Sequence, residues 1–455
     1  MTPARRAAYE VLRRAFEHDA WADRAFRSAA ERLGLAGRDR GFAQRLAYGA
    51  VQRRGTADHF AALLADRPVA KLDPPIRAAL RLGLFEILFM DGENDHAAVG
   101  EAVELAKGGP GGGRRRGAAA GLVNAVLRRA ARERGTLLDG LGDATPSGAA
   151  VAHSMPLWIA ERWWEEVGPA GARALMVAAN EPAEHALRVN TLLSGAEAVA
   201  REIAGAGEPL KPARADDPLL APPESVLAPG AWGPELRARI EAGRLVAQSR
   251  ASQAVVAVLD PRPGERVLDL CAGPGIKTTQ IAARMTNRGE VVAVEADPGR
   301  GSEIEALAER LGAGCVRVVI ADAAADDLGE GYDRVLVDPP CTDLGALAAR
   351  PDARWRKTAA QVEALGELQG AILARAAAAL RPGGALVYST CTISRRENED
   401  VVRRVLAARG ELAADDLGAD HPGLASAHDG RFLQTRPDRD DTAGFFIARL
   451  RRGGG

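Results

Sequence analysis

The spacing of apolar side chains changes character near residue 185 of this 455-residue chain. Before that point, apolar residues recur every three or four positions, which is the period of an amphipathic helix. The predicted helices cover residues 3–18, 96–107 and 120–134, and a further one begins at Asp73, where Pro74 suits the first turn. No alternating strand pattern occurs in this part, so residues 1–139 are predicted to form an all-helical domain.

The middle of the chain has a mixed pattern. Residues 140–155 are rich in Gly, Ala, Pro and Ser, which is typical of a linker. A helix with Trp158, Trp163 and Trp164 follows, and then a short strand at 187–190. We therefore expect residues 156–245 to form a small mixed α/β subdomain.

From residue 266 onward, short buried apolar runs alternate with helical segments. The predicted strands are 267–270, 291–294, 316–320, 335–337 and 385–388, and the clearest helix covers 361–380. This order predicts an α/β, doubly wound, mainly parallel, Rossmann-like sheet in a domain of residues 246–455. Ligands bind such sheets beyond the carboxyl ends of the strands.

The turn after the first of these strands is built for a ligand. Small residues allow close approach of the backbone, and the following helix offers free N–H groups. Glu295 ends the second strand and can accept both hydroxyls of a ribose, while Asp322 follows the third and can accept an adenine amino group. The glycines match neither the dinucleotide fingerprint nor a phosphate loop. Together these features favour S-adenosylmethionine as the cofactor. The candidate binding residues are Cys271, Ala272, Gly273, Pro274, Gly275, Ile276, Lys277, Glu295, Arg300, Asp322 and Asp338.

Two of the four cysteines follow late strands of the sheet. One ends Asp338-Pro339-Pro340-Cys341 and the other is Cys391, directly after Thr390. The remaining two, Cys271 and Cys315, fit the ordinary role of a small buried hydrophobic residue. Since no Cys-x-x-Cys pair or nearby His has metal-ligand spacing, we expect neither a metal site nor a disulfide framework.

A pair of thiols at one edge of the sheet suits methylation of cytosine at carbon 5. A thiolate that attacks carbon 6 makes carbon 5 nucleophilic, and a second group must later remove the proton from carbon 5. Asp338 is the candidate to supply a proton at ring N3, and Lys277 is the candidate cation to lower the thiol pKa. The spacing alone does not decide which cysteine attacks.

At these residues the sequence resembles the NOL1/NOP2/Sun family of RNA cytosine-C5 methyltransferases. The matching motifs are residues 271–278, 338–341, 350–356, 380–384, 390–391, 397–399 and 444–446. The resemblance implies that Cys391 attacks the base and that Cys341 assists product release. Departures include Gly273, Ile276 and Glu295 where the family usually has Ala, Gly and Asp, and Pro339 where Ala is common.

The N-terminal part resembles the all-helical NusB RNA-binding fold. The matching segments are residues 46–49, 72–76, 103–107 and 123–128. A NusB-like domain joined to this catalytic domain implies the Sun/Fmu branch of the family, whose substrate is cytosine in 16S ribosomal RNA.

Charge and hydropathy add two expectations. Residues 1–139 hold 24 Lys and Arg against 17 Asp and Glu, while the whole chain has a net charge of −1. This asymmetry fits either a polyanion-binding domain, with Arg114, Arg115 and Arg116 in a basic loop on the phosphates, or a solvated Arg-rich surface. The apolar runs are too short for a membrane span or a signal peptide, so we expect a cytoplasmic protein, as a monomer.

Three other functions are compatible with parts of the pattern. A DNA cytosine methyltransferase would use Cys341 as its nucleophile, but Thr390-Cys391 and the NusB-like part argue against it. An amino-group methyltransferase would need an aromatic residue at position 341. A ribosome-assembly factor with an inactive methyltransferase fold would lack catalytic residue types that are present here, and a transfer-RNA cytosine-C5 methyltransferase differs only in its substrate.

Overall fold

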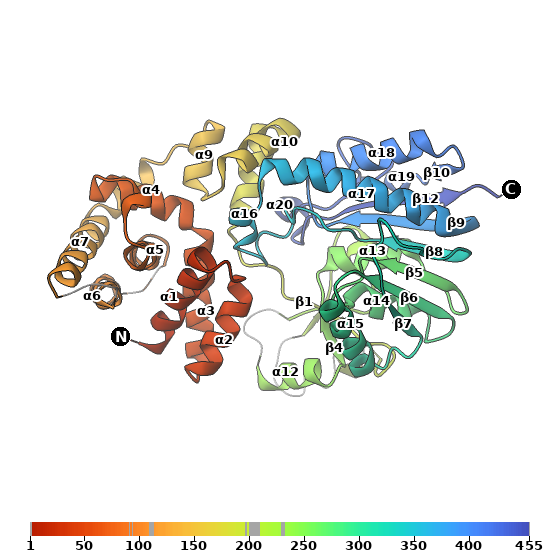
Figure 1. Ribbon diagram of the computed structural model, residues 1–455, viewed down its shortest axis with the longest axis horizontal. Coiled ribbons are helices and arrows are strands. Elements are labelled where there is room, and N and C mark those ends of the chain that lie inside the picture. Colours follow the sequence, from red (N-terminus) through yellow and green to blue (C-terminus); the bar gives the residue numbers. More distant parts are fainter. Residues whose placement is uncertain are drawn as a thin grey trace. The chain divides into compact units, whose positions relative to one another are not determined.

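The computed structural model describes residues 2–90, 92, 94–108, 113–195, 198–199, 210–228 and 233–454, with the backbone alone at 113–116. The chain forms two compact units (Figure 1). The helical unit consists of Met1–Pro182 together with Leu347–Lys357, and the catalytic unit consists of Ala183–Ala346 and Thr358–Gly455. Among the described residues, no helix is both long enough and apolar enough to span a membrane.

The helical unit confirms the all-helical prediction. Its helices are α1 (Pro3–Glu17), α2 (Ala22–Arg32), α3 (Gly37–Gln52), α4 (Arg54–Ala65), α5 (Pro74–Phe89), α6 (Asp95–Lys107), α7 (Gly113–Arg132), α8 (Arg134–Asp139), α9 (Pro146–Ala152) and α10 (Leu157–Ala178). Pro74 occupies the first turn of α5, as predicted, with Asp73 before it. Alanine and leucine side chains fill the core, and the helices pack closely, since a Cβ at Gly49 would lie 2.0 Å from the Phe85 ring.

The division of the chain differs from the predicted one. Residues 140–155 were expected to be a linker but contain α9. The Thr145 side chain caps the start of this helix by accepting from the N–H of Gly148, and Pro146 is its first residue. A segment from between the two halves of the catalytic unit, Leu347–Lys357, belongs to the helical unit. Its Arg354 is fully buried and donates to the carbonyls of Ser154 and Ala179 at 3.2 and 2.7 Å.

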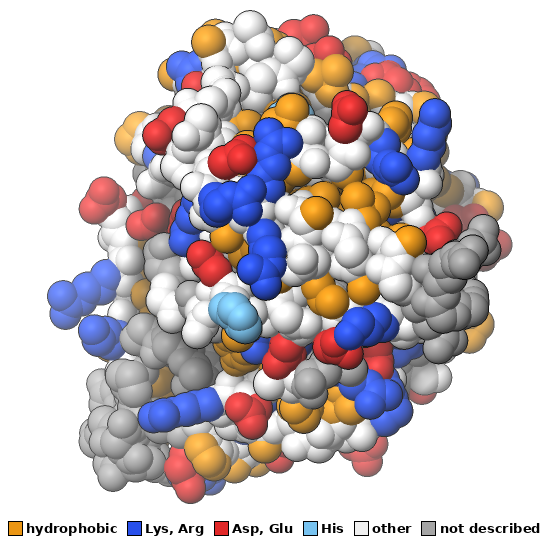
Figure 2. Space-filling model, turned by 90° about the vertical axis from the view of Figure 1, so that its left-hand side faces the viewer, with side chains coloured by type: hydrophobic (Ala, Val, Ile, Leu, Met, Phe, Trp, Pro, Cys, Tyr) orange, Lys and Arg blue, Asp and Glu red, His pale blue; other side chains and the backbone are white. Residues whose placement is uncertain are grey.

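Charged side chains of both signs cover the side of the molecule at the left of Figure 1. Figure 2 shows basic and acidic groups interspersed there, with hydrophobic groups exposed between them. Arg114, Arg115 and Arg116 lie outside the residues whose side chains are described. The predicted contact of these three arginines with RNA phosphates therefore stays a prediction.

The catalytic unit begins with a small antiparallel sheet. Its strands are β1 (Ala186–Val189), β2 (Lys211–Pro212), β3 (Ser225–Leu227) and β4 (Leu245–Ala247), in the order β2-β3-β1-β4, with helix α12 (Pro234–Glu241) beside them. This sheet and helix lie within the predicted subdomain of residues 156–245, but the catalytic unit begins at Ala183 rather than at residue 156.

The main sheet confirms the predicted Rossmann-like architecture. Its strand order is β10-β12-β9-β8-β5-β6-β7, and β11 pairs with β12. The strands are β5 (Arg266–Leu270), β6 (Glu290–Glu295), β7 (Val316–Ile320), β8 (Tyr332–Val337), β9 (Leu380–Thr390), β10 (Leu412–Ala414), β11 (Leu433–Gln434) and β12 (Phe446–Arg452). The five strands β7, β6, β5, β8 and β9 are parallel to one another. Strand β12 pairs antiparallel with β9, and β10 pairs antiparallel with β12.

Alternate residues of each strand face different helices, as the two-residue period of a strand requires. Leu268 and Leu270 pack with α17 (Ala359–Ala379) and α18 (Glu399–Ala408) in one core. Val267 packs on the other face with α13 (Arg250–Leu259) and α14 (Ile276–Arg284). Helix α15 (Pro298–Leu311) follows β6 (Figure 1). Loops leave the parallel strands at their carboxyl ends, which is the edge of such a sheet where ligands bind.

Candidate active site

The turn between β5 and α14 joins the predicted cofactor residues into one structure. The backbone N–H of Gly273 donates to the Oε2 atom of Glu295 at 3.0 Å, and the guanidinium of Arg300 donates to the carbonyl of Gly273 at 2.6 Å. A Cβ at position 273 would lie 2.5 Å from that carboxylate oxygen, so the glycine allows this close contact with the present positions of both side chains. Gly275 begins α14 with a φ of 95°, in the left-handed region that favours glycine.

Two carboxylates stand at the carboxyl ends of neighbouring strands. Glu295 ends β6 and is buried, with its Oε1 atom accepting from the backbone N–H of Asp297 at 3.2 Å. Asp322 lies two residues beyond β7, is exposed, and accepts from the backbone N–H of Ala324 at 2.8 Å. The Glu295 carboxylate, fixed beside the glycine turn, fits the ribose hydroxyls of an adenosine. The Asp322 carboxylate, after the next strand, fits its adenine amino group.

A partly buried ion pair lies between this turn and the loop after β8. The ammonium of Lys277, in the first turn of α14, lies 2.7 Å from the Oδ2 atom of Asp338. The same ammonium stands 5.0 Å from the centre of the Phe445 ring. The structure therefore brings Lys277 and Asp338, which are 61 residues apart in sequence, to one edge of the sheet.

The two strand-end cysteines meet at the same edge. Their Sγ atoms lie 3.3 Å apart, although Cys341 and Cys391 are 50 residues apart in sequence. The Sγ atom of Cys391 also lies 3.0 Å from the Oδ1 atom of Asp343, a residue to which we assigned no role from the sequence. Tetrahedral zinc ligands at about 2.3 Å would hold two sulfurs about 3.8 Å apart, so the closer spacing is that of hydrogen-bonded thiols. The expectation of a metal-free site stays a prediction.

A buried carboxylate joins the two cysteine loops. Glu397, at the end of the short helix η3 (Arg395–Glu397), is fully buried. It accepts from the N–H of Thr342 at 2.9 Å and from its hydroxyl at 2.5 Å. That hydroxyl lies 2.9 Å from the hydroxyl of Thr392, and Gln369 binds both Glu397 and the carbonyl of Pro340. The backbones beside both thiols are therefore held by one polar network.

The environment of Cys391 opposes ionisation of its thiol. The hydrogen bond with Cys341, burial, and the charges of Cys341, Asp343 and Asp338 raise the pKa of Cys391 well above its usual value. The Lys277 ammonium pairs with Asp338 and also attracts the Cys391 sulfur. Its expected effect of lowering the Cys391 pKa stays a prediction, since the effects that raise this pKa prevail in sum. Burial lowers the pKa of Lys277, but attraction to Asp338, Cys391 and Asp269 together outweighs burial, and the net shift is upward.

The other two cysteines have settings that suit structural roles. Burial, followed by the charges of Asp338 and Glu295, raises the pKa of Cys271 to about 12. Burial also raises the pKa of Cys315, which directly precedes β7. Both thiols therefore stay protonated at neutral pH.

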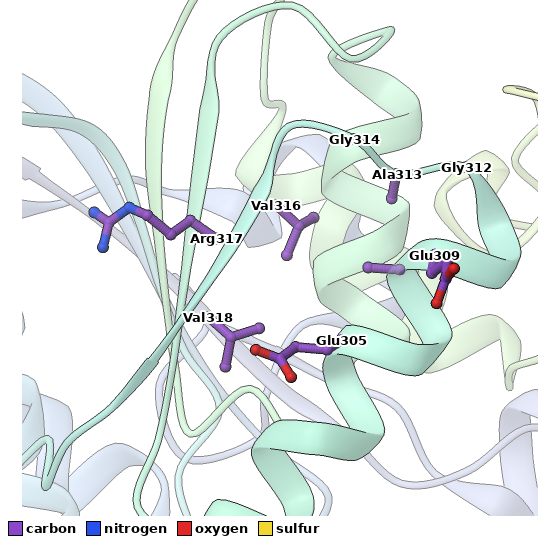
Figure 3. Close-up of a pocket in the computed structure, with 9 residues that line it drawn as sticks. Glu305, Glu309, Gly312, Ala313, Gly314, Val316, Arg317 and Val318 are labelled. Atoms are coloured by element: carbon purple, nitrogen blue, oxygen red, sulfur yellow. The ribbon is translucent and has the colours of Figure 1, made fainter.

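A surface pocket elsewhere in the catalytic unit is separate from this site. Figure 3 shows it between α15 and the start of β7. Its lining residues include Glu305, Glu309, Arg317 and Val318, and none of the predicted site residues. Because Val316 begins β7, the pocket borders the amino end of that strand, whereas the cysteines follow carboxyl ends.

Comparison with known proteins agrees with this arrangement. The family model described as 16S rRNA methyltransferase RsmB/F matches residues 256–451, and the NusB family model matches residues 2–132. The ribosomal RNA small subunit methyltransferase B of Thermus thermophilus is 35% identical over 416 residues, covering 91% of this chain and 89% of that protein. This chain belongs to the RsmB/F family of RNA methyltransferases. Membership in the RsmB/F family confirms the resemblance to the Sun/Fmu branch and the RNA substrate class.

Solved structures extend the likeness of this RsmB/F-family chain to the whole fold. The crystal structure of PH0851 has a TM-score of 0.80 and 26% identity, and the alignment covers 99% of both chains. The crystal structure of NSun6 from Pyrococcus horikoshii with SFG has a TM-score of 0.56 and 25% identity, covering 65% of this chain and 97% of that one. The predicted cofactor, S-adenosylmethionine, is confirmed as that of the family.

Proposed function

We propose that this chain methylates carbon 5 of a cytosine in 16S ribosomal RNA through a covalent bond between Cys391 and carbon 6. The observation that carries the proposal is the pair of thiols 3.3 Å apart at the carboxyl ends of β8 and β9. Carbon 5 needs a nucleophile to activate it and a separate acceptor for its proton. A thiol pair beside a cofactor turn supplies both groups.

The cofactor turn has the chemistry that S-adenosylmethionine needs. Glu295 and Asp322 would hold the ribose and the adenine, and Gly273 keeps space and a fixed N–H beside Glu295. When bound, S-adenosylmethionine supplies an electrophilic methyl group.

The chain's own residues divide the remaining steps. The Cys391 sulfur bonds to carbon 6 as its proton leaves, and the Lys277–Asp338 pair holds a proton at ring N3, so that electrons gather at carbon 5. Cys341 acts as a thiolate after losing its own proton to solvent, and after methylation its sulfur accepts the proton from carbon 5. The electrons of that C–H bond restore the double bond between carbons 5 and 6, and the Cys391 sulfur leaves.

The helical unit is the proposed RNA-binding appendage. Its match to the NusB family and the positive excess of residues 1–139 support this assignment. A base must leave its stack to reach the thiols, at a cost of about a few kcal/mol that a single-stranded target reduces. Phosphate contacts by the helical unit would hold the RNA while the base moves.

The proposal is tested by incubating the protein with small-subunit RNA and labelled cofactor, followed by digestion to nucleosides and mass spectrometry. We expect the label in 5-methylcytidine, retained in Cys315→Ala and lost in Cys391→Ala. Label on a ring amino group or on ribose would show a different reaction, and label on transfer RNA alone would show a different substrate.

A further inference from the structure

Asp343 holds its carboxylate against the attacking sulfur. Its Oδ1 atom lies 3.0 Å from the Sγ atom of Cys391 and 4.0 Å from that of Cys341. The residue is only 9% exposed. An ionised carboxylate only accepts hydrogen bonds, so the thiol of Cys391 donates its proton to Asp343.

The backbone at Asp343 is left-handed, a conformation that aspartate adopts more readily than most residues with a side chain. Its φ is 59°, in the left-handed region, where a non-glycine residue costs of the order of 1 kcal/mol or more. The loop is fixed on both sides, by Thr342 bound to Glu397 and by the N–H of Gly345, which donates to the carbonyl of Cys391 at 3.0 Å. These contacts on both sides hold the Asp343 carboxylate against the Cys391 sulfur.

The nucleophile needs a proton acceptor when it attacks. Among the described residues, the charged and titratable groups with the largest electrostatic effects on Cys391 include Asp338, Cys341 and Asp343 from the loop after β8, and Lys277 of α14 also interacts with it. Lys277 is a cation and cannot accept a proton, and Cys341 must itself take one later in the reaction. The Asp338 carboxylate lies 2.7 Å from the Lys277 ammonium, whereas the Asp343 carboxylate lies 3.0 Å from the sulfur that must lose its proton.

We propose that Asp343 is the general base that removes the thiol proton of Cys391 during attack on carbon 6. This inference rests on the proposed function. As the S–H bond breaks, its electron pair forms the bond to carbon 6 and the proton moves to the carboxylate of Asp343. When the sulfur leaves the methylated base with the pair from that bond, the proton returns from Asp343 to Cys391. The step needs no further reactant.

The attack step is measured in a Cys341→Ala background, where the covalent complex with RNA accumulates. Rates of complex formation, with small-subunit RNA and S-adenosylmethionine, are read from denaturing gels between pH 6 and 9. Two variants are compared. Asp343→Asn keeps an oxygen that accepts a hydrogen bond but cannot take up a proton, and Asp343→Gly removes the side chain while favouring the left-handed backbone. The matched control is Asp260→Gly, another aspartate with a φ of 51°, at the end of α13.

We expect both Asp343 variants to form the complex about 10²- to 10⁴-fold more slowly at pH 7, the usual contribution of a general base. With the base, the rate should be nearly independent of pH, and without it the rate should rise about tenfold per pH unit as the thiol ionises in solution. A rate or pH profile unchanged in Asp343→Gly would overturn the proposal, as would a slower rate with an unchanged pH profile. If the Cys341→Ala protein forms no complex and the unmodified protein makes no 5-methylcytosine, the proposed function itself fails.

Discussion

Replacing Asp269 by asparagine should change how the stability of the catalytic unit depends on pH. Asp269 lies in β5, paired in register between Ala293 of β6 and Leu336 of β8, and is 1% exposed. Burial raises the pKa of Asp269 to about 7, although the hydroxyl of Thr278 donates to its Oδ2 atom at 2.6 Å and acts in the opposite direction.

The magnitude follows from the difference between the folded and unfolded states. The pKa of Asp269 rises from 3.8 to about 7 on folding. Between these values the folded state binds more protons than the unfolded state, so the free energy of unfolding falls as pH rises. The full loss is about 4 kcal/mol, of which about 3 kcal/mol falls between pH 5 and 8. Below about pH 4 the loss is absent, and above pH 7 it is complete.

The assay is urea unfolding at pH 5 and pH 8. Unfolding is monitored by hydrogen exchange of the β5 amides, so that the measured free energy of unfolding is that of the catalytic unit. Asp269→Asn should be more stable relative to the unmodified protein at pH 8 than at pH 5, by about 3 kcal/mol. Glu309→Gln, at an exposed position on α15, serves as the control and should leave the pH dependence unchanged. An equal difference between Asp269→Asn and the unmodified protein at both pH values would refute the reasoning.

Two further predictions concern ligands. Glu295→Ala should weaken binding of S-adenosylhomocysteine about tenfold or more by calorimetry, because it removes the buried carboxylate that would accept from the ribose hydroxyls, whereas Glu309→Ala, at an exposed position on α15, should bind normally. Undiminished binding by Glu295→Ala would show that Glu295 does not hold the cofactor. Replacing Arg114, Arg115 and Arg116 by alanine should reduce the salt dependence of RNA binding by about 0.7 to 0.9 in logarithmic slope for each phosphate that these side chains neutralise. An unchanged slope would show that these arginines do not contact RNA phosphates and only form part of a solvated surface.

The pattern of apolar residues located most of the sheet because parallel strands are buried on both faces. Strands β5 to β9 contain continuous apolar runs, whereas β12 alternates apolar residues with Arg449 and Arg451, as an antiparallel strand near the edge does. The helical content of residues 140–155 was missed because small residues are common in both linkers and short helices. Even so, Pro146 after Thr145 was a readable helix start.

The sequence predicted which site residues meet where a distinctive residue directly follows a strand. It did not predict the contacts that form where two loops fold against each other. Both cysteines and Asp338 follow strands, so their meeting at one edge follows from the parallel order. The contact of Asp343 with Cys391 depends on a left-handed turn that no local pattern indicated. The pairing of Lys277 with Asp338 depends on a distance between two loops that spacing in the sequence does not give.

The central claim is the division of labour between the two thiols, and denaturing gel electrophoresis of each variant with substrate RNA tests it most directly. Cys341→Ala should trap a covalent protein–RNA complex, because attack proceeds while the proton on carbon 5 has no acceptor. Cys391→Ala should form no complex and no methylated product. A complex that persists in Cys391→Ala and is absent from Cys341→Ala would contradict the account and assign the attack to Cys341.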